Sequence, residues 1–181
     1  MHLRLLFVIT VILHAAAAFV QYPITSGHTP ASRMATTDDF LLKKKTALTL
    51  SVAKALCAAA IETAKQNAWT VCVSLLDDGG NLVCFERMDG TQIGSIAVSQ
   101  EKGLTAVRFK RPTKVFEDMI KGGAGVNMLG LPGATPLEGG VPLVVDGEVI
   151  GAIGVSGVTS AQDGIIAAAA VARLEQICSR P

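Results

Sequence analysis

Two cations, three carboxylates and a pair of glycines provide the groups needed to bind and react with a small anionic molecule. They are Arg87, Lys102, Asp89, Glu138, Asp163, Gly139 and Gly140. A cation anchors an anionic substrate, and a carboxylate within reach of the reacting proton acts as a general acid or base. Backbone N–H groups of the glycines could stabilise a developing oxyanion. One hypothesis is therefore an enzyme that acts on an anionic metabolite.

The same charged residues also have ordinary structural explanations. Cations interspersed with Glu86, Glu101 and Glu117 are typical of a solvated face. Asp163 falls near the start of a predicted helix, where a carboxylate accepts backbone N–H groups and interacts favourably with the helix dipole. The sequence leaves both explanations open.

Histidine is confined to the first 28 residues, at positions 2, 14 and 28. A mature chain that begins near Met34 therefore contains no histidine. This excludes from the body a Ser-His-Asp or Cys-His catalytic set. It also excludes an H-E-x-x-H metal site and a histidine-ligated haem.

The cysteines, at positions 57, 72, 84 and 178, form no C-x-x-C motif. A zinc knuckle and a thioredoxin-type pair are therefore excluded. We expect each cysteine to be a small buried hydrophobic residue. A disulfide stays open, because four cysteines allow three pairings among which the sequence does not choose.

Length and charge predict one globular domain without a nucleic-acid surface. Half of the 181 residues are apolar, which suffices for one sizeable core. Lys and Arg total 16 against 15 Asp and Glu, so no basic excess favours nucleic acid. Aromatic residues make up 4% of the chain, too few for a platform that stacks bases.

The N-terminal part has the composition of targeting segments. Arg4, an apolar run over residues 5–13 and an A-x-A motif predict a signal peptide over residues 1–18. Residues 19–45 form a transit-like or linker segment, rich in Ser and Thr and with Asp38 as the first acidic residue. We expect the chain to enter the secretory pathway and to be secreted, or to reach a plastid through a two-part targeting sequence. The apolar run is shorter than the roughly 20 residues that span a bilayer, so no stable membrane span is expected after cleavage.

Hydrophobic periodicity predicts an α+β domain over residues 46–181. Helices are expected over residues 49–67, 95–107, 112–121 and 160–179. Strands are expected over residues 69–76, 82–88, 141–145 and 149–156, the last two joined by an Asp-Gly turn. Residues 122–140 form a glycine-rich loop. Hairpins that alternate with helices favour an antiparallel sheet covered by helices.

Three glycines recur at every third position near the end of the last predicted strand, at 151, 154 and 157. Their spacing is not that of a dinucleotide-binding loop. Ser156 is not in a nucleophile elbow, because Val158 stands where G-x-S-x-G requires glycine. Glycine weakens a strand, so we expect either a helix packed closely against it or a ligand lying on it.

Two stretches of the body carry a resemblance to a known family. The first contains D-D-G-G at 77–80 and R-M-D-G at 87–90, and the second is G-G-V-P-L-V-V-D-G-E-V-I-G-A-I-G-V-S-G at 139–157. Over roughly residues 46–178 the chain resembles the GlcG/HbpS family of haem-binding and haem-degrading domains, also found as the C-terminal domain of PduO-type proteins. The resemblance implies a profilin-like fold, with a five-stranded antiparallel sheet flanked by helices, and a homo-oligomer.

The resemblance further implies binding of haem or a related tetrapyrrole, for carriage, sensing or slow oxidative degradation. Cations that could pair with the haem propionates are Arg87, Lys102, Arg108 and Arg111. Without histidine, the iron would take a thioether, a cysteine thiolate, an oxygen ligand or water. The thioether candidates are Met88, Met119 and Met128.

Three hypotheses follow, and whether the protein is an enzyme stays undecided. The first is a haem- or tetrapyrrole-binding protein, as the resemblance implies. The second is a haem-independent enzyme acting on an anionic metabolite. The third is a non-catalytic oligomeric assembly subunit whose Ala- and Gly-rich surfaces pack against copies of itself.

Overall fold

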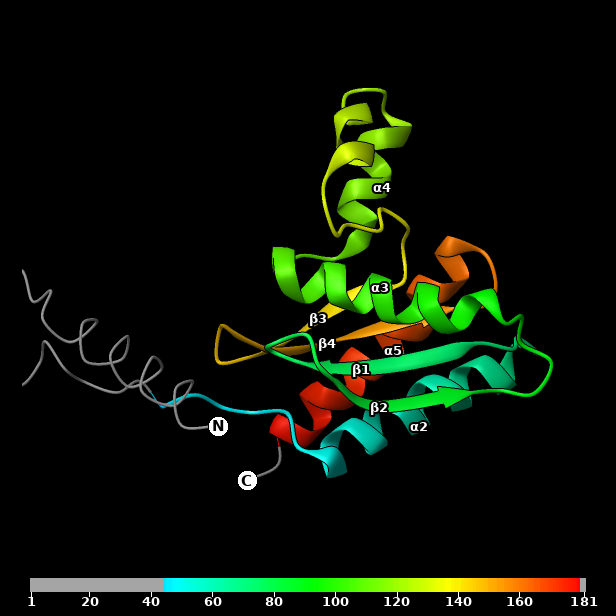
Figure 1. Cartoon of the computed structure of the whole chain (residues 1–181). Coiled ribbons are helices and arrows are strands. Elements are labelled where there is room, and N and C mark those ends of the chain that lie inside the picture. The colour runs from blue at the N-terminus through cyan, green and yellow to red at the C-terminus, as the bar shows by residue number, and fades with distance from the viewer. Residues whose placement is uncertain (1–43, 180–181) are drawn as a thin grey trace, which may run out of the picture. The chain divides into compact units, whose positions relative to one another are not determined.

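The computed structural model describes residues 44–179, which form an α+β domain as the sequence predicts (Figure 1). The elements are α2 (Leu50–Gln66), β1 (Cys72–Asp77), β2 (Leu82–Arg87), α3 (Gly94–Phe109), α4 (Thr113–Lys121), η2 (Val126–Gly130), β3 (Gly140–Val145), β4 (Glu148–Ser156) and α5 (Ser160–Cys178). Each predicted helix and strand is present, with ends that differ by a few residues. The short 3-10 helix η2 lies within the segment predicted as a glycine-rich loop.

The four strands form one antiparallel sheet in the order β2-β1-β4-β3. Helix α3 covers one face of this sheet, and α2 and α5 lie side by side on the other (Figure 1). The predicted Asp-Gly turn joins β3 to β4, with φ values of 51° at Asp146 and 78° at Gly147. Such a turn matches the twist of the two strands it connects.

The main hydrophobic core lies between the sheet and the pair α2 and α5. Leu56 and Ile166 from the helices and Leu75 and Ile153 from the strands are fully buried there. The helical residues recur at helical spacing and the strand residues alternate along β1 and β4, which is the pattern expected of elements that bury one face.

Helix α3 packs closely on the opposite face because small residues lie on both sides of the contact. The hydroxyl oxygens of Ser74 and Ser99 are hydrogen-bonded at 2.7 Å, and both residues are buried. A Cβ on Gly154 would collide with the carbonyl oxygen of Ser99 and would lie 2.6 Å from the backbone nitrogen of Gly103. Helix packing, one of the two explanations expected for the glycine spacing, therefore requires glycine at this position of β4.

The expectation of a five-stranded sheet is wrong for the described part of the chain, which contains four strands. Residues 122–139 supply no further strand. Pro132 and Pro136 each remove one N–H group from this segment, which disfavours a strand there, whereas Pro142 is tolerated because β3 is an edge strand. The profilin-like arrangement stays a prediction.

The targeting predictions fall almost entirely outside the described residues. Residues 1–18, the expected signal peptide, lie there, as does all of the 19–45 segment except its last two residues. The three histidines lie there too. Within residues 44–179, no helix is both long enough and apolar enough to cross a membrane.

The four cysteines are free thiols with different exposures. Cys57 and Cys72 are buried, as expected, whereas Cys84 is half-buried and Cys178 is exposed. The expectation of a buried residue is wrong for Cys178, because it is the last residue of α5, and only partly met by Cys84, which lies on the edge strand β2.

Helix α4 and η2, residues 113–130, form a helical arm that stands away from the sheet beyond α3 (Figure 1). Phe116 anchors the arm, since it is buried and its ring packs edge-on against Phe109 at 5.4 Å between centroids. The arm also exposes apolar side chains, which are Val115, Met119, Val126 and Leu129. No residue of the arm belongs to the main hydrophobic core.

Substituting Gly154 by alanine tests the close contact of α3 with β4. Gly154→Ala is expected to lower the free energy of unfolding by about 1–3 kcal/mol, because the added methyl group forces the helix away from the strand. Gly94→Ala is the matched control, since nothing surrounds its Cβ position and alanine favours a helix. Urea unfolding followed by circular dichroism measures both. A Gly154→Ala protein as stable as the unsubstituted chain would contradict the packing described.

Candidate functional site

The structure separates the sequence-predicted residues into three places. The first group meets where α3, the loop before β3 and the start of α5 come together, and consists of Lys102, Glu138, Gly139, Gly140 and Asp163. The second group lies at the end of β2 and just after it, and consists of Arg87, Met88 and Asp89. The third group lies at the C-terminal end of α3 and on the helical arm, and consists of Arg108, Arg111, Met119 and Met128.

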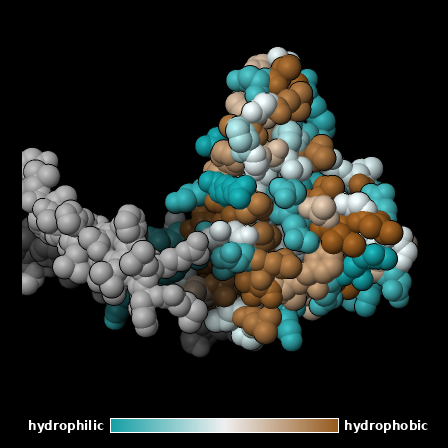
Figure 2. All heavy atoms as spheres, viewed as in Figure 1, coloured by the Kyte–Doolittle hydropathy of each residue, from teal (hydrophilic) through white to brown (hydrophobic). Residues whose placement is uncertain are grey.

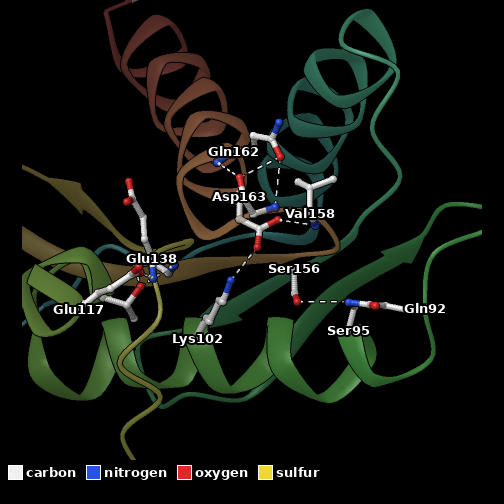
Figure 3. Close-up of polar contacts among 12 residues, drawn as sticks. Gln92, Ser95, Lys102, Glu117, Glu138, Ser156, Val158, Gln162 and Asp163 are labelled. Atoms are coloured by element: carbon white, nitrogen blue, oxygen red, sulfur yellow. Dashed lines mark hydrogen bonds and ion pairs between the residues drawn. The ribbon is translucent and has the colours of Figure 1, made fainter. Parts of the chain in front are cut away.

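Lys102 and Asp163 form a buried ion pair at the centre of the first group (Figure 3). Lys102 Nζ donates to Asp163 Oδ2 at 2.7 Å, and the two side chains are 3% and 2% exposed. Lys102 belongs to α3 and Asp163 to the first turn of α5, which cover opposite faces of the sheet. The pair therefore connects the two helical layers, and loss of either partner would leave an uncompensated buried charge.

Asp163 is held by the start of α5 as well as by Lys102. Its Oδ1 accepts a hydrogen bond from the backbone N–H of Val158 at 3.3 Å, and Thr159 and Gln162 form a capping box beside it. Burial raises the pKa of Asp163, and the hydrogen bond and positive charge of Lys102 offset part of that rise. Asp163 thus occupies the expected position at the helix N-terminus and, in addition, takes part in an ion pair.

Two glycines allow the backbone to pass next to the ion pair. Gly139 has a φ of 127°, and a Cβ there would lie 3.0 Å from Lys102 Nζ and 2.9 Å from Asp163 Cβ. A Cβ on Gly140 would collide with the carbonyl group of Lys102. The N–H of Gly140 donates to Thr113 Oγ1 at 2.9 Å, so this donor is already engaged.

Glu138, which is labelled in Figure 3, is the more accessible of the two carboxylates in the first group. Its side chain is 20% exposed, with Lys114 Nζ 3.7 Å from its Oε2. Its backbone N–H donates to Glu117 Oε2 at 2.5 Å, and Glu117 Oε1 pairs with Lys121 at 2.5 Å. Burial by itself raises the pKa of Glu117, but the hydrogen bonds from Lys121 and from Glu138, with the charge of Lys121, outweigh it and lower that pKa.

Thr113 and Glu117 belong to this site although neither was a sequence-predicted site residue. Both are buried and lie four residues apart on one face of α4. Of the three glutamates expected on a solvated face, Glu86 and Glu101 are exposed, but Glu117 is not. The sequence feature that could have identified Thr113 and Glu117 is their position on the face of α4 that also carries the apolar Phe116.

The chemistry open to this group centres on Glu138. The ammonium of Lys102 is buried and already paired, so it is engaged within the protein. Glu138 is the carboxylate that solvent reaches, and a carboxylate in that position could exchange a proton with a molecule bound at the surface.

The second and third groups lie at opposite ends of α3. Arg87 pairs in the sheet with Cys72, which pairs with Ser156. The Ser156 hydroxyl donates to Ser95 in the first turn of α3, whereas Arg108 lies in its last turn. The 16 residues of α3 span about 24 Å. Arg87 and Arg108 of one chain therefore cannot hold the same small anion.

Breaking the buried ion pair should destabilise the fold more than removing both charges. Lys102→Met is expected to lower the free energy of unfolding by about 3–5 kcal/mol, because Asp163 stays buried without its partner. The double variant Lys102→Met with Asp163→Leu should recover much of that loss. Urea unfolding is measured for the unsubstituted chain, for Lys102→Met and Asp163→Leu separately, and for the double variant. If the losses of the two single variants simply add in the double variant, the proposed coupling of the pair is wrong.

The lowered pKa of Glu117 predicts a pH dependence of stability. Its ionised form is favoured in the folded protein, so its contribution is complete above its ordinary pKa of 4.5 and is lost as the pH falls through the lower folded value. As the pH falls from about 5.5 to about 3, the free energy of unfolding should therefore decrease less for Glu117→Gln than for the unsubstituted chain. The exposed Glu101→Gln is the control. Unfolding curves at several pH values measure the difference, and equal acid sensitivity of all three proteins would contradict it.

Known proteins share this fold over most of the described domain. The family model described as haem degrading protein HbpS-like matches residues 48–172. Protein GlcG of Escherichia coli strain K12 is 45% identical over 115 residues, which are 64% of this chain and 85% of GlcG.

Two solved structures are also similar. A PduOC:heme complex is 32% identical at a TM-score of 0.65, covering 71% of this chain and 95% of that one. A crystal structure of HbpS is 30% identical at a TM-score of 0.66, covering 72% of this chain and 92% of that one. The chain belongs to the HbpS-like family.

Proposed function

We propose that the protein binds haem or a related tetrapyrrole. The observation that carries this proposal is membership of a family described as haem-degrading, together with the similarity to a domain solved in complex with haem. Carriage, sensing and slow oxidative degradation are the roles that such binding would serve.

The helical arm is the surface of the described domain that suits a flat apolar ligand. Its exposed apolar residues are Val115, Met119, Val126 and Leu129. Hydrophobic atoms also gather near the end of the arm in the space-filling view (Figure 2). Apolar side chains grouped on an exposed element are a common sign of a ligand or partner surface. The porphyrin ring would lie against these side chains.

Two arginines at the base of the arm suit the propionates of such a ligand. A guanidinium nitrogen of Arg108 would lie 2.6 Å from a Cβ on Gly133, so Arg108 reaches over the loop that follows η2. Arg111 lies over the ring of Phe116, with Cζ 5.8 Å from the ring centroid. Both arginines are exposed, and guanidinium groups hold carboxylates in bidentate pairs.

Within residues 44–179 the iron would take a ligand other than histidine, because this part of the chain contains none. Thioether sulfur is an established axial ligand of haem. Met119 on α4 and Met128 on η2 both belong to the helical arm, whereas Met88 packs against the main core. Bound haem would supply a redox-active iron, and the arm would supply its apolar contacts, its propionate partners and one axial thioether.

Haemin titration of the full chain, followed at the Soret band, tests this proposal. A saturable shift at one haem per chain is expected. One of the two variants Met119→Ala and Met128→Ala removes the axial thioether, and that variant should change the Soret band and weaken haemin binding. Arg108→Gln and Arg111→Gln should each weaken it roughly tenfold, the size of a hydrogen bond to a charged group. Met88→Ala is the matched control and should bind haemin normally.

Two outcomes would contradict this assignment. Saturable binding that is lost only in Met88→Ala would move the site to the end of β2. A broad band without saturation would remove haem from the function, leaving the haem-independent enzyme or the assembly subunit.

We also propose that the protein forms a homo-oligomer. Strands β2 and β3 are the two edges of the sheet, and each exposes a large apolar side chain, Leu82 on β2 and Val144 on β3. Exposed edges of this kind favour association unless they are covered. Copies of the chain would cover them.

A further inference from the structure

A group of sulfur and oxygen ligands lies on the face of the sheet opposite α3. It consists of Cys57, Cys84 and Glu86, whose ligand atoms all lie within 4.8 Å of one another. None of these residues takes part in the ion pair of Lys102 and Asp163, and none belongs to the helical arm. The cluster is therefore independent of the tetrapyrrole site proposed above.

The fold brings these three side chains together through one helix and one strand. Cys84 and Glu86 are two residues apart on β2, so they project from the same face of the sheet. In the ladder they pair with Leu75 and Val73 of β1, both of which lie in the core beneath α2 and α5. Cys57 belongs to the buried face of α2, which packs across this side of β2 (Figure 1).

Burial decreases across the cluster from the helix toward solvent. Cys57 is fully buried, Cys84 is half-buried and Glu86 is exposed. Strand β2 is an edge strand, so no further strand closes the outer side of the cluster in the described part of the chain. An ion could enter from this edge, and a water molecule could keep one coordination position.

A bound cation would compensate the negative charges of the cluster. Metal ligands act in their deprotonated forms, so Cys57 and Cys84 would bind as thiolates beside the Glu86 carboxylate. A cation held between the three ligand atoms, which lie within 4.8 Å of one another, would balance these charges together.

The donor set selects the kind of metal. Calcium and magnesium require oxygen ligands throughout, whereas two thiolates with one carboxylate suit zinc and similar thiophilic ions. A tetrahedral zinc site places such ligand atoms roughly 3.3–3.8 Å apart. The three atoms therefore need to approach one another by no more than about 1.5 Å to reach that geometry.

We propose that Cys57, Cys84 and Glu86 bind a thiophilic divalent ion of the zinc class, with water in the fourth position. On binding, the two thiols each release a proton to solvent as the two metal–sulfur bonds form. The ion loses water molecules in exchange for the two sulfurs and the carboxylate oxygen. No electron transfer is involved.

Cadmium titration of the full, reduced chain tests this site directly. Cadmium bound by thiolate has an ultraviolet charge-transfer band that carboxylate sites lack, and the band should saturate at one ion per chain. Cys178→Ser serves as the background, since it removes the exposed thiol from the assay. Cys72→Ala is the matched control. Cys72 is a buried cysteine of β1 outside the cluster, so the band should be unchanged in that variant.

The three ligand variants should have different effects. Cys84→Ser should remove about half of the band intensity and weaken binding. Glu86→Gln should keep the band but weaken binding roughly 10- to 100-fold or more, since even outer-shell partners of a metal contribute this much. Cys57→Ser is informative only if it folds. Cys84 is half-buried and Glu86 is exposed, so Cys84→Ser and Glu86→Gln are expected to fold. These two variants therefore decide the test even if Cys57→Ser does not fold.

Zinc provides a second readout that does not depend on the sulfur band. Excess zinc should raise the Tm of the unsubstituted chain and of Cys72→Ala, and should displace cadmium from both. It should leave the Tm of Cys84→Ser nearly unchanged. Three results would overturn the proposal: a band that does not saturate, cadmium binding unaffected by Cys84→Ser and Glu86→Gln, or a Cys57–Cys84 disulfide in a protein that takes up no metal.

Discussion

The buried ion pair of Lys102 and Asp163 is the contact on which the arrangement of the domain depends. It joins α3 on one face of the sheet to α5 on the other, at 2.7 Å and with both side chains almost completely excluded from water. Desolvation of two charges is costly, and only good geometry with additional hydrogen bonds offsets it. Gly139 and Gly140 allow the chain to pass close enough for that geometry, because a Cβ at either position would meet the pair or its backbone. The glycines and the ion pair therefore form one structural unit.

The two faces of the sheet are built from different chemistry, and this difference determines where ligands can bind. The face under α2 and α5 is a conventional apolar core. The face under α3 is close-packed through serines and glycines such as Ser99 and Gly154, which leave little space for a ligand between helix and strand. Ligand sites are consequently expected at the periphery of the sheet rather than on its covered faces. The helical arm and the outer edge of β2 are both peripheral.

These two peripheral regions suit different ligands. The arm combines exposed apolar side chains with Arg108 and Arg111, which suits a flat molecule with anionic substituents. The edge of β2 places Cys84 and Glu86 against the buried Cys57, which suits a small thiophilic ion. A domain of this size can carry both, because α3 and the sheet separate them and no residue is shared.

The sequence by itself determined the α+β class, the order of helices and strands and the primed Asp-Gly turn, because these follow from local periodicity and turn chemistry. It also identified Lys102, Glu138 and Asp163 as residues of interest, although not that Lys102 and Asp163 would be paired. Only the tertiary structure decided that pairing, the burial of Glu117 and the meeting of Cys57 with Cys84. Such contacts join residues far apart in the chain, and their distances depend on how elements pack rather than on spacing along the sequence. The family resemblance implied a fifth strand, but the described chain has four, and the segment before β3 forms η2 and loop instead, where Pro132 and Pro136 each remove a ladder N–H group.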